Sequence, residues 1–180
     1  EQAERVAHFH GASAVEARAL ARLGQASGLT GLTVSHSSPH GSRLSTLAGS
    51  PHVVDVVSVD GTFMRLRRHV AAFFQGNRYL LNDLVRHVVG QVEAGSVVYD
   101  LYAGTGLFAV PAAVARQARV TAIEGDRAAA IDLEANAQQT AGAVHAVHQS
   151  VEAFVEAAEG RPDLVIVDPP RTGLSRDAMD

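Results

Sequence analysis

The sequence predicts an α/β fold built on a parallel sheet, and three observations support this prediction. Strand-like and helix-like patterns alternate from residue 96 onward. A glycine-rich turn, beginning at Gly104, follows the first of these strands, and an acidic turn, beginning at Asp168, follows the fourth. Strands that alternate with helices imply right-handed crossovers, and therefore a parallel sheet covered by helices on both faces.

The first part of the chain predicts a small region that precedes this sheet. Residues 13–24 have helical spacing of apolar positions, with Ser13 as N-cap and Gly24 as the stop, so we expect a short helix. Residues 28–51 are rich in Gly, Ser and Pro, so we expect a loop with one strand at 29–35. Residues 53–68 predict a β-hairpin, because an Asp-Gly pair suited to a type I′ turn separates two β-rich runs.

Helical spacing returns at Asn77 and predicts a helix that ends near Gly90. Beyond it we expect strands at 96–101, 119–124, 143–148 and 163–168, and helices near 107–118, 126–139 and 150–159. We therefore expect two domains: residues 1–72 as part of a small domain with the hairpin, and residues 73–180 as a nucleotide-binding α/β domain. Six strands are usual in doubly wound folds, so a sheet that stops after four suggests a truncated domain.

The composition of the chain excludes several kinds of functional site. The 180 residues contain no cysteine, which excludes disulfides, thiolate metal sites and a cysteine nucleophile within them, and the nine histidines lack the partners of a metal site. No run approaches the roughly 18 apolar residues that cross a membrane, and the start lacks the pattern of a secretory signal, so we expect a cytoplasmic protein. The net charge is −4. Other parts must therefore help to hold any RNA, because nucleic-acid affinity comes largely from neutralised phosphates.

The glycine-rich turn predicts a nucleotide cradle. Gly104 and Gly106 permit positive φ and a close approach of ligand to backbone. The same residues also fit the pattern of NAD-binding loops. Glu124, twenty residues beyond Gly104, suits ribose hydroxyls under either interpretation. Asp100 favours S-adenosylmethionine over NAD, because a carboxylate beside the loop repels a pyrophosphate but can pair with a methionine ammonium. The alternative is that Asp100 is a solvated acid at a strand end.

Two other segments carry candidate residues. In the DPPRTG segment, prolines fix the backbone after a buried strand and hold Asp168 at the carboxyl end of that strand. This arrangement points to methyl transfer onto a nucleic acid base. The alternative is a plain turn that ends the strand. The FFQGN segment, residues 73–77, could close over a cofactor or supply core aromatics and a helix cap. A basic cluster, Arg65, Arg67, Arg68 and His69, could contact RNA phosphate or form a solvated strand face.

Taken in order, FFQGN, DLYAGTG, AIEGD and DLVIVDPPRTG resemble the bacterial RNA 5-methyluridine methyltransferases, which modify tRNA and large-subunit rRNA. The similarity covers about residues 50–175. It implies a Rossmann-like class I methyltransferase sheet, S-adenosyl-L-methionine as cofactor and RNA, either rRNA or tRNA, as partner. Asp100 joins the residues that the resemblance implies, because it can pair with the methionine ammonium. The expected cofactor-binding residues are then Gln75, Asp100, Tyr102, Gly104, Gly106, Glu124 and Asp168. The substrate-binding set is Asp168, Pro169 and Arg171, the last for a phosphate or an acid.

The chain also departs from that family. It has Gly76, Ala103 and Leu107 where the family usually has Val, Cys and often Asn. The resemblance places the nucleophilic cysteine and the general base after Asp180, and it implies an N-terminal barrel and, in some members, an iron–sulfur cluster outside this chain. Uracil C5 attacks a sulfonium methyl only after a thiolate adds to C6, and a base then removes the C5 proton. We therefore expect this chain to bind cofactor without turnover.

Three other functions remain open at this point. An enzyme that methylates an amino nitrogen usually has an aromatic residue after the two prolines, where this chain has Arg171. An NAD-dependent oxidoreductase is disfavoured by Asp100 and by the DPPR turn. A non-catalytic paralogue that binds S-adenosylmethionine or RNA would suit the lack of cysteine.

Overall fold

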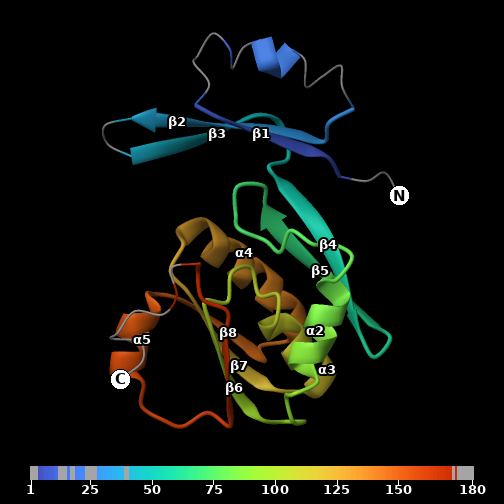
Figure 1. Ribbon diagram of the computed structural model, residues 1–180, viewed down its shortest axis with the longest axis vertical. Helices are drawn as coiled ribbons and strands as arrows, with labels where there is room; N and C mark the ends of the chain where they lie inside the picture. The colour runs from blue at the N-terminus through green and yellow to red at the C-terminus, as the bar shows by residue number, and fades with distance from the viewer. Residues whose placement is uncertain are drawn as a thin grey trace. The chain divides into compact units, whose positions relative to one another are not determined.

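The computed structural model describes residues 4–11, 16, 19–22, 28–38, 41–171 and 173. The chain forms two compact units, each described here by itself. The first unit comprises Glu1–Val54 and Arg68–Ala71, and the second comprises Asp55–Arg67 and Ala72–Asp180. The chain passes from the first unit to the second between Val54 and Asp55, in the first strand of the hairpin. It returns to the first unit between Arg67 and Arg68, in the second strand, and enters the second unit again at Ala72 (Figure 1).

The first unit contains a three-stranded sheet in the order β1-β2-β3, made of β1 (Val6–His10), β2 (Gly31–Ser38) and β3 (Gly41–Gly49). Strand β1 runs parallel to β2, and β3 antiparallel to it. The strand expected at 29–35 corresponds to β2, but the loop expected over the rest of 28–51 is wrong, because this part also contains β3. A Cβ on Gly31 would lie 1.7 Å from the carbonyl oxygen of Ser50, so this glycine serves close packing of backbones. Of the helix expected at 13–24, residues 16 and 19–22 are helical, and the rest lie outside the described residues.

The predicted hairpin is confirmed as β4 (His52–Val59) and β5 (Thr62–His69), which form a two-stranded sheet. Asp60 and Gly61, in the turn, have φ of 50° and 81°, as a type I′ turn requires. Alternate residues of both strands are buried in the core of the second unit: Val57, Val59, Met64 and Leu66. The period-2 pattern of the sequence therefore decides which face of the hairpin packs inward.

Helix α2 (Leu81–Val89) begins four residues later than Asn77, the expected start. The side chain of Asn77 accepts hydrogen bonds from the N–H groups of Tyr79 and Leu80, at 3.1 and 3.3 Å, and so forms a turn ahead of the helix. Asparagine favours such local bonds to backbone over a helix interior, which explains the later start.

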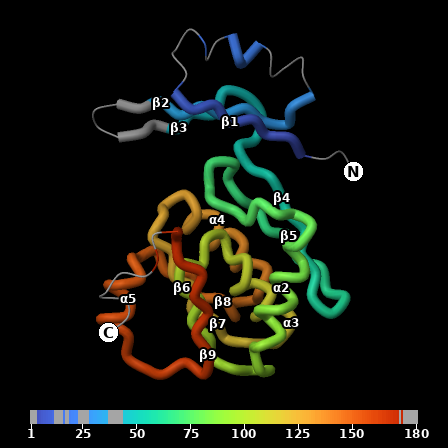
Figure 2. The backbone as a smooth tube through the Cα atoms, viewed as in Figure 1, coloured from blue at the N-terminus to red at the C-terminus, as the bar shows by residue number. Residues whose placement is uncertain are grey.

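The second unit is built on a parallel sheet of four strands in the order β8-β7-β6-β9. This confirms the predicted α/β fold with a parallel sheet. The strands are β6 (Val97–Leu101), β7 (Arg119–Glu124), β8 (Val144–His148) and β9 (Leu164–Val167). The helices between them are α3 (Ala109–Arg116), α4 (Arg127–Ala137), which continues into the short 3-10 helix η1 (Gln138–Thr140), and α5 (Val151–Ala157) (Figure 2).

Two apolar clusters hold this sheet, one on each face. The larger joins even-numbered positions of β6 and β7 to α2, α3, α4 and the hairpin. The smaller joins Leu101, Ile123 and Val151 on the side of α5, where Tyr99 packs edge-on against Phe154. In the part of the chain that the structure describes, no helix is both long and apolar enough to cross a membrane.

The strand order reverses at β6, because β7 and β8 lie on one side of it and β9 lies on the other. In open α/β sheets, ligands bind outside the carboxyl ends of the strands at such a switch point. The loop after β6 and the turn after β9 leave the sheet side by side at this point. The topology therefore selects these two segments as the candidate site.

Candidate functional site

The loop between β6 and α3 carries the two glycines of the predicted cradle, and they have different surroundings. Gly104 has φ of 56° and Gly106 has φ of 90°. A Cβ on Gly104 would meet no atom within 4 Å, whereas one on Gly106 would lie 2.9 Å from Cδ1 of Leu133 and 3.3 Å from Cγ2 of Val110. Gly104 therefore keeps a space open beside the loop, and Gly106 lets the loop pack onto α3 and α4.

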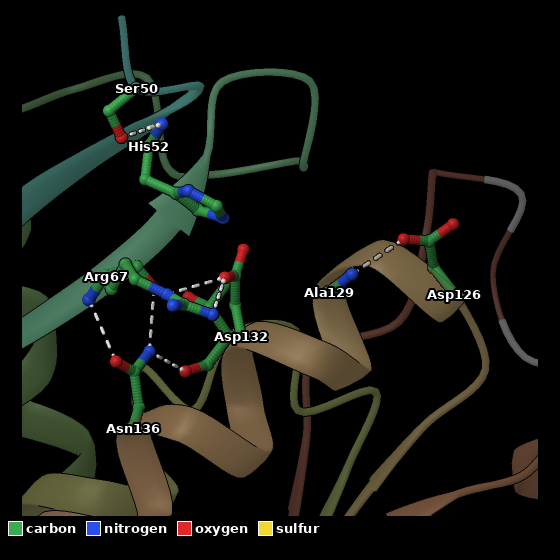
Figure 3. Close-up of polar contacts among 8 residues, drawn as sticks. Ser50, His52, Arg67, Asp126, Ala129, Asp132 and Asn136 are labelled. Atoms are coloured by element: carbon green, nitrogen blue, oxygen red, sulfur yellow. Dashed lines mark hydrogen bonds and ion pairs between the residues drawn. The ribbon is translucent and has the colours of Figure 1, made fainter. Parts of the chain in front are cut away.

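Glu124, the last residue of β7, holds this loop in place. Its Oε2 accepts a hydrogen bond from the N–H of Gly104 at 2.7 Å, and its Oε1 accepts one from the N–H of Asp126 at 2.6 Å. Asp126 in turn caps α4, because its Oδ1 accepts a bond from the N–H of Ala129 at 2.9 Å (Figure 3). Each Glu124 oxygen keeps a second acceptor position, so the carboxylate could also take two ribose hydroxyls.

Asp100 lies in β6 with no exposed surface. Within the described part of the chain, neither of its carboxylate oxygens has a hydrogen-bond partner, and the same is true of the Thr105 hydroxyl. Burial raises the pKa of Asp100 from 3.8 to about 8; the negative charges of Asp168 and Glu124 add to this, and the backbone N–H of Ala109 partly opposes it. Asp100 is therefore protonated at neutral pH, and the alternative of a solvated strand-end acid is wrong.

Asp168 and Gln75, which are 93 residues apart, meet beside this loop. The Nε2 of Gln75 donates to Oδ2 of Asp168 at 2.9 Å. Asp168 is exposed, and Gln75 is half-buried. The two aromatic residues before Gln75 differ, because Phe74 packs against the main core while Phe73 is 76% exposed. The FFQGN and DPPR segments therefore come together at the switch point.

The other predicted site residues lie around this centre. Tyr102 has φ of 60° and packs among the apolar residues on the side of α5. Burial raises the pKa of its phenol, and a hydrogen bond to Glu152 and the charge of Glu152 raise it further. Pro169 is half-buried and Arg171 is exposed. The N–H of Gly173 donates to the carbonyl of Pro170 at 2.8 Å, which closes the turn after β9.

In the basic cluster of the hairpin, Arg67 is engaged within the protein. Its Nη2 lies 3.0 Å from Oδ1 of Asp132, and its Nε donates to the same oxygen at 3.1 Å. The sequence argument missed Asp132 and Asn136, which lie one turn apart on the buried face of α4. Two polar residues with this spacing among apolar positions are the signal that could have marked them.

Among the residues that the structure describes, no three His, Cys, Asp or Glu side chains gather in a way that could hold a metal ion. The donors around the glycine loop are instead single carboxylates, an amide and backbone N–H groups. Such donors suit an organic ligand with hydroxyl and amine groups better than a bare cation.

The sheet order, the glycine loop after β6 and the acidic residue that ends β7 define a class I methyltransferase fold. The structure is similar to that of the Pyrococcus abyssi tRNA (uracil-54, C5)-methyltransferase in complex with S-adenosyl-L-homocysteine, with a TM-score of 0.62 and 24% identity over 83% of this chain and 37% of that one. It is also similar to the M. jannaschii tRNA m1G37 methyltransferase, with a TM-score of 0.57 and 17% identity over 95% of this chain and 51% of that one. These likenesses establish the fold.

The sequence profile of the family described as conserved hypothetical protein 95 matches residues 81–175, more than half of the chain, and the chain belongs to this family. One curated relative, an uncharacterized RNA methyltransferase of Thermotoga maritima, is 37% identical over 111 residues, which are 60% of this chain and 25% of that protein. Another with the same description, from Bifidobacterium longum, is 31% identical over 142 residues, which are 70% of this chain and 32% of that protein. The chain thus spans a quarter to a third of the length of these relatives.

Proposed function

We propose that this chain binds S-adenosyl-L-methionine and forms the cofactor-binding part of an enzyme that methylates RNA. The observation that carries the proposal is the meeting of three segments at the switch point of the sheet. They are the open glycine loop clamped by Glu124, the Gln75–Asp168 pair, and the buried Asp100. The RNA methyltransferase description of the curated relatives supports the same activity.

The residues around the loop fit this cofactor. Glu124 has free acceptor positions for ribose hydroxyls, and Gly104 leaves room where a side chain would collide with a ligand. The ammonium of the methionine moiety would lower the pKa of Asp100 and restore its charge. Tyr102 would contact the cofactor from the side of α5, and the backbone of Gly106 would complete the loop. When bound, S-adenosyl-L-methionine supplies a sulfonium methyl group.

The substrate that we propose is a uridine of rRNA or tRNA, methylated at carbon 5 in the cytoplasm. The FFQGN and DPPRTG segments support this, because they are the parts of the resemblance specific to uracil-5 enzymes. Asp168 and Pro169 would lie against the base, and Arg171 would pair with a phosphate. The thiolate nucleophile would have to come from outside these 180 residues, which contain no cysteine.

A second candidate target is the N1 atom of guanine. The m1G37 enzyme has nearly the same structural similarity to this chain as the uracil-54 enzyme, so the fold favours neither target base. Methylation of guanine N1 needs a base to remove a proton but no thiolate adduct.

Calorimetric titration tests the cofactor. We expect S-adenosylhomocysteine to bind and NADH not to bind, because negative charge at Asp168 and Glu124 disfavours a pyrophosphate. The Asp168→Ala variant should bind S-adenosylhomocysteine about tenfold more weakly, since it loses a charged hydrogen-bonding group. Asp163→Ala is the matched control, because Asp163 precedes the other end of β9, where its carboxylate accepts a bond from the N–H of Val97. Binding of NADH, or of neither ligand, would contradict the proposal.

A methyl-transfer assay tests the target base. The chain is incubated with S-adenosyl-L-methionine labelled in its methyl group and with bulk rRNA and tRNA, and nucleosides are then analysed by mass spectrometry. We expect cofactor binding without transfer, because the uracil-5 reaction lacks its thiolate here. Labelled 5-methyluridine would show that methyl transfer to uridine does not need a cysteine. Labelled 1-methylguanosine would show that the target is guanine N1, the second candidate, and not uridine.

A further inference from the structure

Asn136, on α4, links the glycine loop to the hairpin through one buried amide group. It is only 3% exposed. Its Oδ1 accepts a hydrogen bond from the N–H of Arg67 at 2.9 Å, and its Nδ2 donates to the carbonyl oxygens of Arg67 and Thr105, both at 2.8 Å (Figure 3). The amide therefore uses both of its N–H donors and its acceptor on backbone groups of two distant segments.

The hairpin side of this link is the free edge of β5. Arg65 and Arg67 alternate along the strand, so their outward backbone groups lie on the same edge. Asn136 bonds both backbone groups of Arg67, and the Nε2 of Gln139 donates to the carbonyl of Arg65 at 3.0 Å. Two side-chain amides, one from α4 and one from η1, thus take the place of a neighbouring strand along this edge.

The loop side of the link is the carbonyl of Thr105, which lies between the two glycines. Tyr102 has a positive φ, which a non-glycine residue keeps only where its surroundings hold it. Gly104 and Gly106 also have positive φ, which glycine adopts freely, so they do not fix the loop by themselves. The Thr105 hydroxyl has no hydrogen-bond partner among the described residues, so this side chain does not anchor the loop through a hydrogen bond. Asn136 instead holds the Thr105 carbonyl, opposite the point where Glu124 holds the N–H of Gly104.

We infer that Asn136 is a positioning residue, which fixes the glycine loop in its ligand-binding conformation and couples it to β5. The inference rests on the proposed function, because it concerns the affinity of this loop for the cofactor. Loss of the amide donors would leave the Thr105 carbonyl without this bond, and the peptide between Thr105 and Gly106 would keep only its N–H bond, from Gly106 to the carbonyl of Ala103 at 2.9 Å. Cofactor binding would in turn stabilise the bonds that Asn136 makes to Arg67, since coupling between two sites is reciprocal.

The first test is the Asn136→Leu variant, which keeps the approximate volume of the side chain but removes both donors and the acceptor at every pH. We expect its affinity for S-adenosylhomocysteine in calorimetry to fall about tenfold. Gln139→Ala is the matched control, because it removes a bond to the same strand edge and none to the loop. It should lower the melting temperature but change the affinity less than about twofold.

The second test uses the unmodified chain and does not depend on a variant that folds. Amide hydrogen exchange is followed by NMR with and without S-adenosylhomocysteine. We expect the ligand to slow exchange at the N–H of Arg67. The N–H of Ser58 on β4 is the control, because it is bonded by the side chain of Asn82, at 3.1 Å, and has no link to the loop.

The outcomes distinguish a failure of the proposed function from a failure of the inference about Asn136. If the unmodified chain does not bind S-adenosylhomocysteine, the proposed function fails and this inference fails with it. If the unmodified chain binds and Asn136→Leu binds equally well, the inference alone is overturned. Unchanged exchange at Arg67 on binding, or equal slowing at Arg67 and Ser58, would overturn the coupling.

Discussion

Replacing Gly106 by alanine should lower the free energy of unfolding by about 2–5 kcal/mol. A residue with a Cβ pays about 1–2 kcal/mol in the left-handed region, and overpacking of a core adds about 1–3 kcal/mol. Both costs apply here, because φ is 90° and the new Cβ would lie 2.9 Å from Leu133 in the middle of α4. Urea denaturation followed by circular dichroism measures the change. A loss below about 1 kcal/mol would mean that the loop can move away from α4.

Gly104→Ala is the companion variant, and it should separate stability from binding. Its Cβ would enter open space, so only the backbone cost of about 1–2 kcal/mol applies. Its affinity for S-adenosylhomocysteine should nevertheless fall at least tenfold, because the methyl group would occupy the space proposed for the ligand. A Gly104→Ala variant that binds as well as the unmodified chain would show that this space lies away from the cofactor.

The second large effect concerns Asp100. The pKa of its carboxyl group is about 8 in the folded protein, against 3.8 as the ordinary value, so the folded protein keeps a proton that the unfolded chain loses across this range. The stability contributed by the protonated group is fully present below about pH 4 and is lost as the pH rises toward 8. We therefore expect Asp100→Asn to be more stable than the unmodified chain at pH 8, by an amount on the order of a few kcal/mol.

Urea denaturation of both proteins between pH 5 and pH 9 measures this difference. The advantage of Asp100→Asn should grow with pH and level off above about pH 8. Asp163→Asn is the control, because it makes the same change from acid to amide at an exposed position. A constant difference between Asp100→Asn and the unmodified chain across this range would contradict the raised pKa.

The same titration should be visible in ligand binding. If a ligand ammonium restores the charge of Asp100, binding of S-adenosylhomocysteine at pH 7 releases a proton from the protein. Calorimetry in two buffers of different ionisation enthalpy would detect this release as a buffer-dependent heat. A heat that is independent of the buffer would mean that Asp100 stays protonated in the complex.

The elements that the sequence predicted well are those whose patterns are local. The hairpin and the four parallel strands combine β-branched runs with clear turn residues, and their ends agree with the structure to within one or two residues. Strand β2 was predicted only in part, at 29–35, and β3 was missed, because their Gly and Ser residues resemble a loop. In the sheet, these small residues instead allow close approach of neighbouring backbones, which depends on partners far away in the chain.

For the candidate site, the sequence predicted positions but not environments. Glu124 and Asp168 lie at the ends of strands, so the rule for parallel sheets brings them to one edge. The pairing of Gln75 with Asp168 joins residues 93 apart, and the complete burial of Asp100 depends on tertiary packing, so no short-range pattern encodes either. Asn136 was missed for the same reason, since its partners belong to β5 and to the glycine loop.

The amides that cover the edge of β5 also have a consequence for the order in which the chain folds. Arg67 and Asn136 are 69 residues apart, so during synthesis β5 leaves the ribosome long before the helix that completes its hydrogen bonds. A two-stranded hairpin is at best marginally stable alone in water. The hairpin should therefore become ordered together with α4 rather than ahead of it, and its exposed edge in the nascent chain is the segment most open to wrong pairing until α4 is made.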